Sequence, residues 1–347
     1  METQGCVGEH AGWIPRHLAC FDGDELVGAM PLYEKHNSWG EFVFDHAWAD
    51  AYQRSGLQYY PKLVNAIPFT PASGQRVLAK KDREDEIIAL LIRGAKTLVQ
   101  DQGYSGIHCL FPSSTERERL NQQGALSRND CQFHWHNHNY HHFDDFLATL
   151  KAKKRKNIRQ ERRKVAESGV TIRRLNGHTA KEQDWLDFTY LYDRIYDRKY
   201  GMPAFNHHYF MRIGEVIPDQ VHLVMVNQGQ HPVAGALMYS DDNTLYGRHW
   251  GCDSYIDCLH FEVCYYQGIE MCIENHWQRF DPGAQGEHKV PRGFLPTRMQ
   301  SLHWMANSPF NQAIEQFVTR EQSGVLNYIN AVADHSPYRE TAEVETL

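Results

Sequence analysis

The fold is decided by a stretch that the chain contains twice, HLACFDGDELVGAMPLYEKHNSWGEFVFDHAWAD at residues 17–50 and HLVMVNQGQHPVAGALMYSDDNTLYGRHWGCD at residues 222–253. Both copies begin with His-Leu, pass through Gly-Ala to a tyrosine, turn at Asn-Ser or Asn-Thr, and end in an aromatic segment with His and Trp. Tyr33 and Tyr239 stand 206 residues apart, and the other matches keep nearly the same offset. Such self-similarity predicts a structural unit that occurs twice.

Each copy predicts a three-stranded meander. A short strand leads to a tight turn at Asp22-Gly23 or at residues 227–229, a longer strand follows, and a polar turn leads to the third strand. The third strand carries His46 and Trp48 in the first copy and His249 and Trp250 in the second. Helical patterns flank both copies, so the predicted class is α/β (α+β) rather than all-β.

Apolar spacing predicts the other elements. Helices are expected over residues 84–102, 143–168, 181–199 and 259–275, with a last helix opening at Pro309, and strands over residues 105–111, 277–281 and 297–305. A length of 347 residues suggests two domains, and we place their boundary near residue 140. The expected domains are residues 1–140 and residues 141–347.

Composition excludes several classes of protein. Hydrophobic residues make up 41% and charged residues 23%, as in an ordinary globular protein rather than a disordered one. No apolar run reaches the roughly 20 residues that a membrane span needs, and no signal peptide is visible, so we expect a cytoplasmic protein. None of the eight cysteines lies in a C-x-x-C pair, which argues against structural zinc and favours reduced packing residues.

Positive charge is concentrated in one segment. Residues 151–164 hold nine Lys and Arg and one acid, in a chain whose net charge is −7. This predicts an anion-binding helix, with Arg155, Lys156 and Arg159 as phosphate contacts. The phosphates of a nucleic acid and those of a smaller ligand such as CoA both remain open, and a solvated basic face is the alternative.

Long segments of the chain resemble the Fem-like (peptidoglycan biosynthesis/recognition) group of the GNAT acyltransferase superfamily. They are GEFVFDHAWADAY (from Gly40), YYPKLVNAIPFTP (from Tyr59), QFHWHN (from Gln132), the basic run KAKKRKNIRQERRKVAESGV (from Lys151), LHFEVCYYQGIE (from Leu259) and GAQGEHKVPRGFLP (from Gly283). The resemblance implies two tandem GNAT-like domains, each a mixed, mainly antiparallel sheet flanked by helices. It also implies an acyl- or aminoacyltransferase that forms an amide bond.

The donor is constrained by a departure from ordinary GNAT sequences. Acetyl-CoA enzymes carry Q/R-x-x-G-x-G/A, whose backbone N–H groups hold a pyrophosphate at a helix N-terminus. Here only near misses occur, QRSGLQ, QDQGYS and RLNGHT. This favours aminoacyl-tRNA, the donor that the resemblance implies. No cofactor is firmly implied, and acyl-CoA remains a possible co-substrate.

The segment GAQGEHKVPRGF is the leading site candidate. Its glycines follow a predicted strand and permit unusual backbone angles, and acid, base and cations come next. We expect Glu287 as general base, His288 and Lys289 polarising the carbonyl, and Arg292 binding substrate. A solvated polar loop is the alternative.

Other candidates lie on the second meander and the helix that follows it. Glu262 is a second candidate base and His260 would orient substrate, although an acid at a helix start commonly just complements the helix dipole. Alternation sends Tyr246 and Arg248 to one strand face and His249 to the other, and we expect Tyr246 and Arg248 to contact substrate.

Two predicted contacts lie in the first half. Lys62, in the segment YYPKLV that carries the resemblance, is an expected substrate contact. His134, with His136 and His138 on the same side of a strand, is expected to form a polar wall of a cleft. A zinc or nickel site is the less favoured interpretation, because no carboxylate or cysteine stands at a matching offset.

The predicted function is transfer of an acyl or aminoacyl group to a small-molecule or peptide amine held in a cleft between the domains. An alternative from a different class is a non-catalytic protein that binds tRNA or another polyanion. A third is an acetyl-CoA enzyme with a non-standard pyrophosphate loop.

Overall fold

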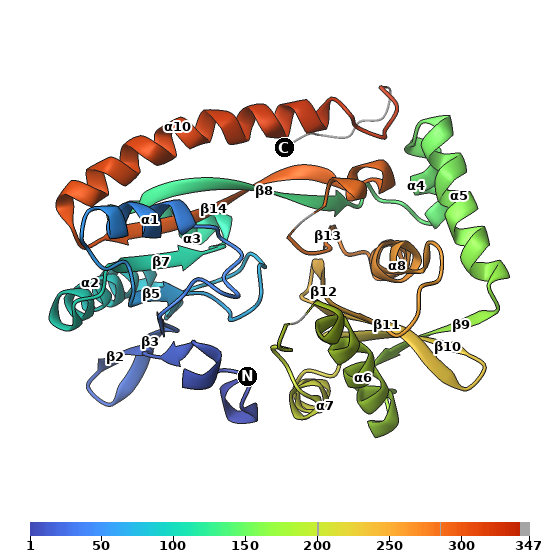
Figure 1. The fold of residues 1–347 in the computed structure, drawn as a ribbon, viewed down its shortest axis with the longest axis horizontal. Coiled ribbons are helices and arrows are strands. Elements are labelled where there is room, and N and C mark those ends of the chain that lie inside the picture. The colour runs from blue at the N-terminus through green and yellow to red at the C-terminus, as the bar shows by residue number, and fades with distance from the viewer. Residues whose placement is uncertain (200, 285, 341–347) are drawn as a thin grey trace.

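The computed structural model describes residues 1–199, 201–284 and 286–340. Two halves lie side by side, and two long strands and the last helix run across both of them (Figure 1). None of the helices formed by the described residues combines the length and the apolar composition that a membrane crossing needs.

The elements follow one another as alternating groups of strands and helices. The strands are β1 (Ile14–Pro15), β2 (Leu18–Asp22), β3 (Glu25–Met30), β4 (Tyr33–Lys35), β5 (Lys62–Asn65), β6 (Leu78–Ala79), β7 (Gly106–Leu110), β8 (Leu126–His136), β9 (Val170–Asn176), β10 (Val221–Gln228), β11 (His231–Ser240), β12 (Thr244–Cys252), β13 (Arg279–Asp281) and β14 (Leu295–Met305). The helices are α1 (His46–Arg54), α2 (Glu84–Gln102), α3 (Ser114–Asn121), α4 (Phe143–Thr149), α5 (Ala152–Glu167), α6 (Glu182–Lys199), α7 (His207–Val216), α8 (Leu259–Phe261), α9 (Gln267–Glu274) and α10 (Ser308–Ala333). A π-helical turn, η4 (Glu262–Tyr266), joins α8 to α9, and a 3-10 turn, η5 (Glu287–Arg292), precedes β14.

Eleven strands form one sheet in the order β1-β4-β5-β7-β14-β8-β13-β12-β11-β10-β9, and β2, β3 and β6 form a small second sheet. Of the ladders between described strands, only β5–β7 and β12–β13 are parallel. In each half a strand, a helical segment and a parallel strand follow in turn, β5–α2–β7 and β12–α8/α9–β13. The predicted class, mixed α/β with a mainly antiparallel sheet flanked by helices, is confirmed.

The halves exchange their last strands at the centre of the large sheet. β14, the last strand of the chain, pairs with β7 of the first half, whereas β8 of the first half pairs with β13 of the second. β8 and β14 also pair with each other, from Leu126 opposite His303 to His134 opposite Leu295. The predicted boundary near residue 140 stays a prediction, and β14 and α10 lie against strands that precede it.

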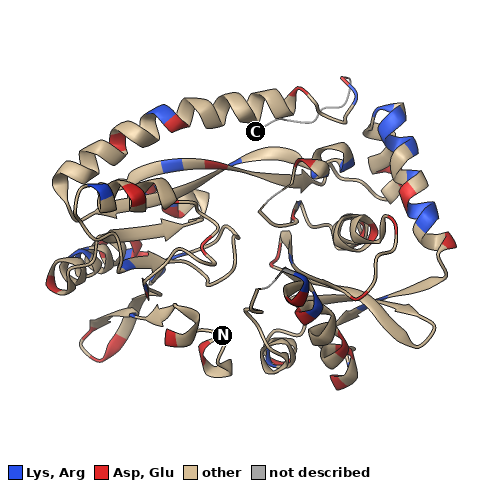
Figure 2. Cartoon of the chain, in the orientation of Figure 1, with Lys and Arg blue, Asp and Glu red and all other residues tan. Residues whose placement is uncertain are grey.

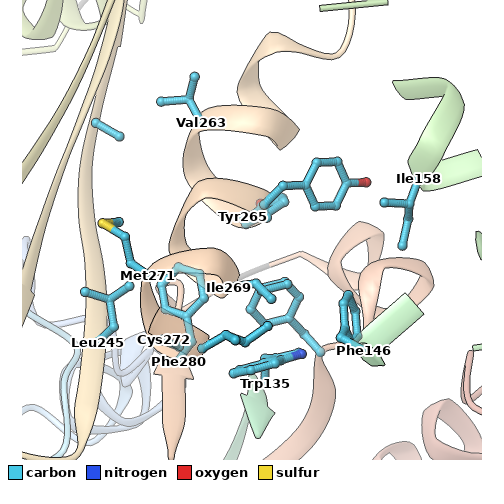
Figure 3. Packing of buried hydrophobic residues seen from close by; sticks show 14 of the residues in the cluster. Trp135, Phe146, Ile158, Leu245, Val263, Tyr265, Ile269, Met271, Cys272 and Phe280 are labelled. Atoms are coloured by element: carbon cyan, nitrogen blue, oxygen red, sulfur yellow. The ribbon is translucent and has the colours of Figure 1, made fainter. Parts of the chain in front are cut away.

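Local sequence accounts for the regular elements. Helix α2 buries its predicted apolar face, places three acids in its first turn, and ends at Gly103, whose φ of 71° favours glycine. The second meander is confirmed as β10, β11 and β12. The basic helix buries Ile158 and Val165, and Ile158 points from α5 into a cluster that includes Tyr265 and Phe146 (Figure 3).

Two predicted elements are wrong. The predicted third strand of the first copy is helix α1, which buries Trp48 and Tyr52, residues spaced four apart. Between Glu41 and Asp45 every second residue is buried, a strand-like alternation that occurs here in a loop. The predicted helix over residues 143–168 is two helices, because Leu150 is extended and forms an isolated bridge with Tyr338.

The exchange predicts that the halves unfold together. Leu302 of β14 is fully buried in the core of the first half with Ile107 and Leu120. Leu302→Ala should lower the free energy of unfolding by about 2–5 kcal/mol, with one transition for the whole chain in urea monitored by tryptophan fluorescence and circular dichroism. Arg298→Ala, at an exposed position of the same strand, should change it by less than about 0.5 kcal/mol. Two separate unfolding transitions, of which Leu302→Ala shifts only one, would contradict the prediction that the two halves unfold together.

Candidate functional site

A cavity of about 710 Å³ lies between the two halves. The first half contributes the loop of residues 37–46 together with Tyr60, Phe69 and Pro71. The second half contributes residues of α6, the α6–α7 connection, β12 and the segment after β13, among them Tyr192, Tyr196, Phe205, Arg248, His249, Gly283 and Ala284. Aromatic rings therefore form much of the wall, and the polar groups among them are few, which is typical of a ligand site.

Arg248 is the cation on the wall from the second half. Its Nη2 donates to Asp281 Oδ2 at 2.9 Å, and its Nη1 donates to the Gly247 carbonyl oxygen at 3.0 Å. Burial opposes ionisation of Asp281, but the Arg248 guanidinium, His134 and the Gly283 N–H together keep the pKa of that carboxyl below its usual value. Within the described part of the chain, Arg248 Nε has no hydrogen-bond partner.

Lys289 and His134 complete a buried cluster behind this wall. Lys289 Nζ donates to the Gly283 carbonyl oxygen at 2.6 Å, while the Gly283 N–H donates to Asp281 Oδ1 at 2.9 Å. Burial lowers the pKa of Lys289 to about 8. His134 Nε2 lies 3.9 Å from Asp281 Oδ2, and burial lowers the pKa of His134 to about 4. The structure thus brings together three predicted site residues, Arg248, Lys289 and His134.

The other predicted site residues of the segment GAQGEHKVPRGF, which are Glu287, His288 and Arg292, do not line this cavity, and Gln285 lies outside the described residues. Arg292 forms two hydrogen bonds with Glu161, at 2.6 and 3.1 Å, and lies 3.4 Å from the centre of the Phe261 ring. His288 Nε2 lies 2.8 Å from the Tyr265 hydroxyl oxygen. Glu287 accepts a hydrogen bond from Tyr328 and lines a second cavity of about 580 Å³, which adjoins the first at Ala284.

Three predicted residues of the meander and the following helix do not line the 710 Å³ cavity. Glu262 is buried and accepts hydrogen bonds from Arg162 and Gln267. His260 packs edge-on against Trp250, and burial lowers the pKa of His260 to about 4. The Tyr246 hydroxyl donates to Asp241 Oδ2 at 2.7 Å.

The basic helix α5 lies at the edge of the molecule (Figure 2). Lys156 and Arg159 are exposed and Arg155 is half-buried, and Arg159 pairs with Asp144 at 2.9 Å. Arg162 and Lys164 of the same helix pair with acids of the segment after β12. The predicted phosphate contacts, Arg155, Lys156 and Arg159, are therefore accessible on the surface, and none of them lines the cavity.

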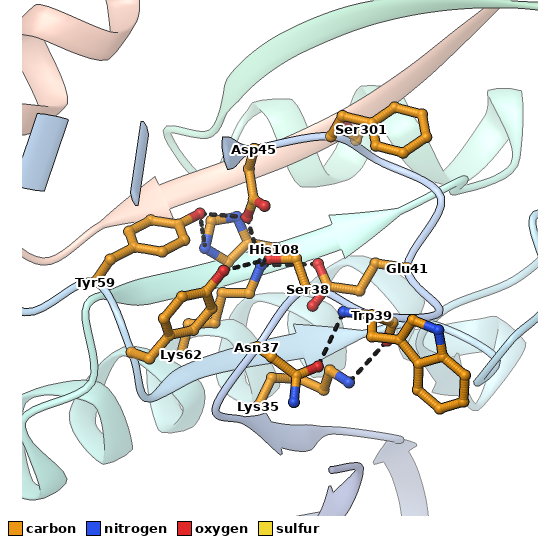
Figure 4. A network of polar contacts seen from close by, with 12 residues as sticks. Lys35, Asn37, Ser38, Trp39, Glu41, Asp45, Tyr59, Lys62, His108 and Ser301 are labelled. Atoms are coloured by element: carbon orange, nitrogen blue, oxygen red, sulfur yellow. Dashed lines mark hydrogen bonds and ion pairs between the residues drawn. The ribbon is translucent and has the colours of Figure 1, made fainter. Parts of the chain in front are cut away.

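The first half holds a second polar cluster, centred on Lys62 (Figure 4). The Lys62 side chain is fully buried, and its Nζ donates to Ser38 Oγ at 2.9 Å, to Glu41 Oε2 at 2.8 Å and to Asp45 Oδ2. The Tyr59 hydroxyl donates to the same Asp45 oxygen at 2.5 Å. Sequence analysis predicts Lys62 as a substrate contact but does not predict that Ser38, Glu41 and Asp45 surround it. Two acids four residues apart in the aromatic stretch GEFVFDH, and a lysine in the apolar strand KLVN, were the available signal.

Burial and charge set the protonation of this cluster. Burial lowers the pKa of Lys62, but Glu41 and Asp45 outweigh that effect and raise it overall, so Lys62 is an ammonium. Burial opposes ionisation of Asp45, but Lys62, with smaller effects of His108 and Ser38, keeps the pKa of that carboxyl well below its usual value. Burial raises the pKa of Glu41 to about 7. Lys35, also fully buried, donates to the Trp39 carbonyl oxygen, and burial lowers its pKa to about 8.

Hydrogen bonds extend the cluster to the exchanged strand β14. The Tyr59 hydroxyl lies 3.5 Å from His108 Nε2, and His108 Nδ1 lies 2.7 Å from His303 Nδ1. His303 Nε2 in turn lies 2.8 Å from Ser301 Oγ. Burial lowers the pKa of His108 to about 3 and that of His303 well below its usual value, so both rings are neutral at pH 7.

Comparisons with known proteins agree on one family and fold. The sequence profile of the FemAB-like family, described as peptidoglycan biosynthesis/recognition, matches residues 1–340. Among solved structures, FemX is 12% identical, with 88% of this chain and 92% of that chain covered and a TM-score of 0.50. L-PGS from Bacillus licheniformis is 11% identical, with 88% of each chain covered and a TM-score of 0.52. These likenesses concern the fold. No curated protein sequence matches the chain.

The buried Glu41 carboxyl predicts a pH-dependent stability. Its folded pKa of about 7 lies above the ordinary value of 4.5, so wild-type protein loses stability as the pH rises through that interval. Glu41→Gln removes the titration. The free energy of unfolding of this variant should therefore rise relative to wild type between pH 4.5 and pH 7, by at least about 1 kcal/mol.

The measurement is urea unfolding at a series of pH values. Asp50→Asn, which removes an exposed carboxylate on α1, is the control and should differ from wild type by less than about 0.5 kcal/mol throughout. A Glu41→Gln difference that stays constant or falls with pH would contradict the assignment.

Proposed function

We propose, since the chain belongs to the FemAB-like family, that it is an acyl- or aminoacyltransferase that joins the acyl group of a donor to an amine in an amide bond. The observation that carries the proposal is the 710 Å³ cavity, whose wall is shared by both halves and holds a buried guanidinium, that of Arg248. Amide formation from an activated ester needs positioning and electrostatic stabilisation more than a covalent nucleophile.

The proposed reaction is a direct displacement. The neutral amine attacks the ester carbonyl carbon of the donor, a C–N bond forms, and the C–O bond to the leaving group breaks. The proton that the amine loses ends on the leaving oxygen, so no redox partner is required. Arg248 holds an acidic group of the acceptor, and Lys289 and His134 keep Asp281 and the Gly283 backbone in place behind it.

Of the two predicted bases, we retain Glu287. Both oxygens of Glu262 accept hydrogen bonds from Arg162, and the residue lies away from the cavity. Glu287 is exposed in the second cavity, which adjoins the first at Ala284. An acceptor that extends across Ala284 would bring its amine toward this carboxylate.

The proposed donor is an aminoacyl-tRNA, and the proposed acceptor is an amine of a peptide. Exposed basic side chains of α5 offer contacts for a nucleic-acid backbone, and the family description refers to peptidoglycan. The same side chains favour the second candidate function, a non-catalytic protein that binds tRNA, which predicts binding without turnover.

The test of turnover uses mild alkali, which hydrolyses the ester bond of aminoacyl-tRNA but leaves the amide product intact. Radiolabelled bulk aminoacyl-tRNA is incubated with the protein and a peptide that carries a free lysine amine, and label that resists mild alkali is counted as amide. Wild type should form such product. Arg248→Gln should lower kcat/KM by about 10- to 100-fold, the effect of losing a hydrogen bond to a charged group.

Arg83→Gln is the matched control, because Arg83 pairs only with exposed acids of the first half among the contacts described, and its activity should equal that of wild type. Circular dichroism verifies folding of both variants. Absence of alkali-stable product with both aminoacyl-tRNA and acetyl-CoA would refute the proposed transferase activity. Product with acetyl-CoA alone would identify an acyl-CoA enzyme.

Binding of tRNA through α5 predicts a steep dependence on salt. The logarithm of the association constant should fall linearly with the logarithm of salt concentration, by nearly one unit of slope per phosphate contact. Charge reversal at Arg155 and Lys156 should weaken tRNA binding. It should also reduce the magnitude of the slope of the logarithm of the association constant against the logarithm of salt concentration by about one to two. Lys80→Glu with Lys81→Glu, an equal charge change at exposed positions of the first half, should do neither. Equal losses in both double variants, measured by filter binding, would argue against a site on α5.

A further inference from the structure

Ser38 connects the buried Lys62 cluster to the cavity. Ser38 lines the cavity, as does Tyr60, and its Oγ lies 2.8 Å from the Tyr60 hydroxyl oxygen. The same Oγ accepts the hydrogen bond from Lys62 Nζ at 2.9 Å. The Lys62, Glu41 and Asp45 side chains are at most 3% exposed. Among the hydrogen bonds described for Lys62, only the one to Ser38 leads to the cavity wall.

The protonation of Lys62 decides what Ser38 can do. A serine acts as a nucleophile when a neighbouring base removes its proton. Lys62 is an ammonium that donates to the Asp45 carboxylate and to the Glu41 carboxyl group, so it also donates to Ser38 and cannot serve as that base. Its charge instead polarises the Ser38 hydroxyl, which becomes a stronger hydrogen-bond donor.

Proton counting shows where that donor points. Ser38 and Tyr60 carry one hydroxyl proton each, and burial raises the pKa of Tyr60, so the phenol is neutral at pH 7. Their mutual hydrogen bond uses one of the two protons, whichever residue donates. The other proton is left for an acceptor outside the pair, either in the cavity that both side chains line or, from Ser38, at the Asp45 carboxylate, whose pKa a Ser38 hydrogen bond also lowers.

The loop that carries Ser38 is firmly packed. Gly40 has a φ of 79°, and a Cβ at this position would lie 2.5 Å from the Phe69 ring. Directly after Gly40, buried Glu41 and then Asp45 tie the loop to Lys62 on β5 through ion pairs. Preorganised donors of this kind are effective because they do not reorganise during the reaction.

We propose that the Ser38–Tyr60 hydroxyl pair, backed by the Lys62 ammonium, binds the acyl carbonyl oxygen of the donor and stabilises the oxyanion formed when the amine attacks. The inference rests on the proposed transferase function and names the residues that the reaction requires. Attack converts the C=O double bond to a C–O⁻ single bond, which accepts the free hydroxyl proton as a hydrogen bond. Collapse restores C=O as the leaving oxygen departs. Lys62 acts through Ser38 and is a positioning residue.

The test separates kcat from KM in the alkali-stable amide assay with aminoacyl-tRNA. Ser38→Ala should lower kcat by about 100-fold, as expected for loss of one oxyanion donor, with KM within about twofold of wild type. Ser38→Thr, which keeps the hydroxyl, should recover most of the rate. Ser55→Ala, at the exposed end of α1, is the control and should match wild type.

A double-mutant cycle distinguishes this role from a purely structural one. Because Lys62 acts through Ser38, Lys62→Met combined with Ser38→Ala should be no slower than the slower single variant. Tyr60→Phe should lower kcat by less than tenfold, since the Ser38 hydroxyl keeps its own proton.

Two results overturn the inference while leaving the transferase function intact. One is a Ser38→Ala variant with kcat within twofold of wild type. The other is an increase in KM with kcat unchanged, which would mean that the pair holds an anionic group of the substrate in its ground state. Failure of wild type to form amide with aminoacyl-tRNA or acetyl-CoA removes both proposals together.

Discussion

The exchange of β8 and β14 is the constraint on which the rest of the structure depends. Each strand completes the sheet of the other half, and the two pair with each other over nine residues of register, from Leu126–His303 to His134–Leu295. Backbone hydrogen bonds therefore run without a break from β1 to β9. A single sheet therefore joins the two halves (Figure 1), and each half contributes one wall of the cavity.

Both walls of the cavity contain a buried ion pair. A buried carboxylate fixes a cation, Asp281 for Arg248 and Asp45 for Lys62, and the cation or a hydroxyl next to it meets the cavity. Burying such pairs is costly unless geometry is good and other hydrogen bonds are satisfied. Here Gly283 N–H supports Asp281 and the Tyr59 hydroxyl supports Asp45. Perturbed protonation at both walls of one cavity is the pattern that functional sites display.

The sequence predicted what local periodicity encodes and missed what depends on distant partners. Helix α2, the second meander and the strand β14 follow from apolar spacing and are confirmed. The break at Leu150 depends on Tyr338, far along the chain. The Lys62 cluster requires knowing that residues 41–45 lie against β5, which no pattern within either segment indicates. The roles assigned to Glu287, Glu262 and the other site residues remain predictions.

The exchanged strands also impose an order on biosynthesis. β8 ends at His136, yet its partners begin at Arg279 and Leu295, so the ribosome releases an eleven-residue strand long before anything in the chain can pair with it. The adjoining edge of β7 stays open for the same interval. Unpaired edges invite association with other chains. From the completion of β8 until the synthesis of β13 and β14, the nascent chain therefore has two exposed sheet edges, which makes it a natural substrate for chaperones that shield them.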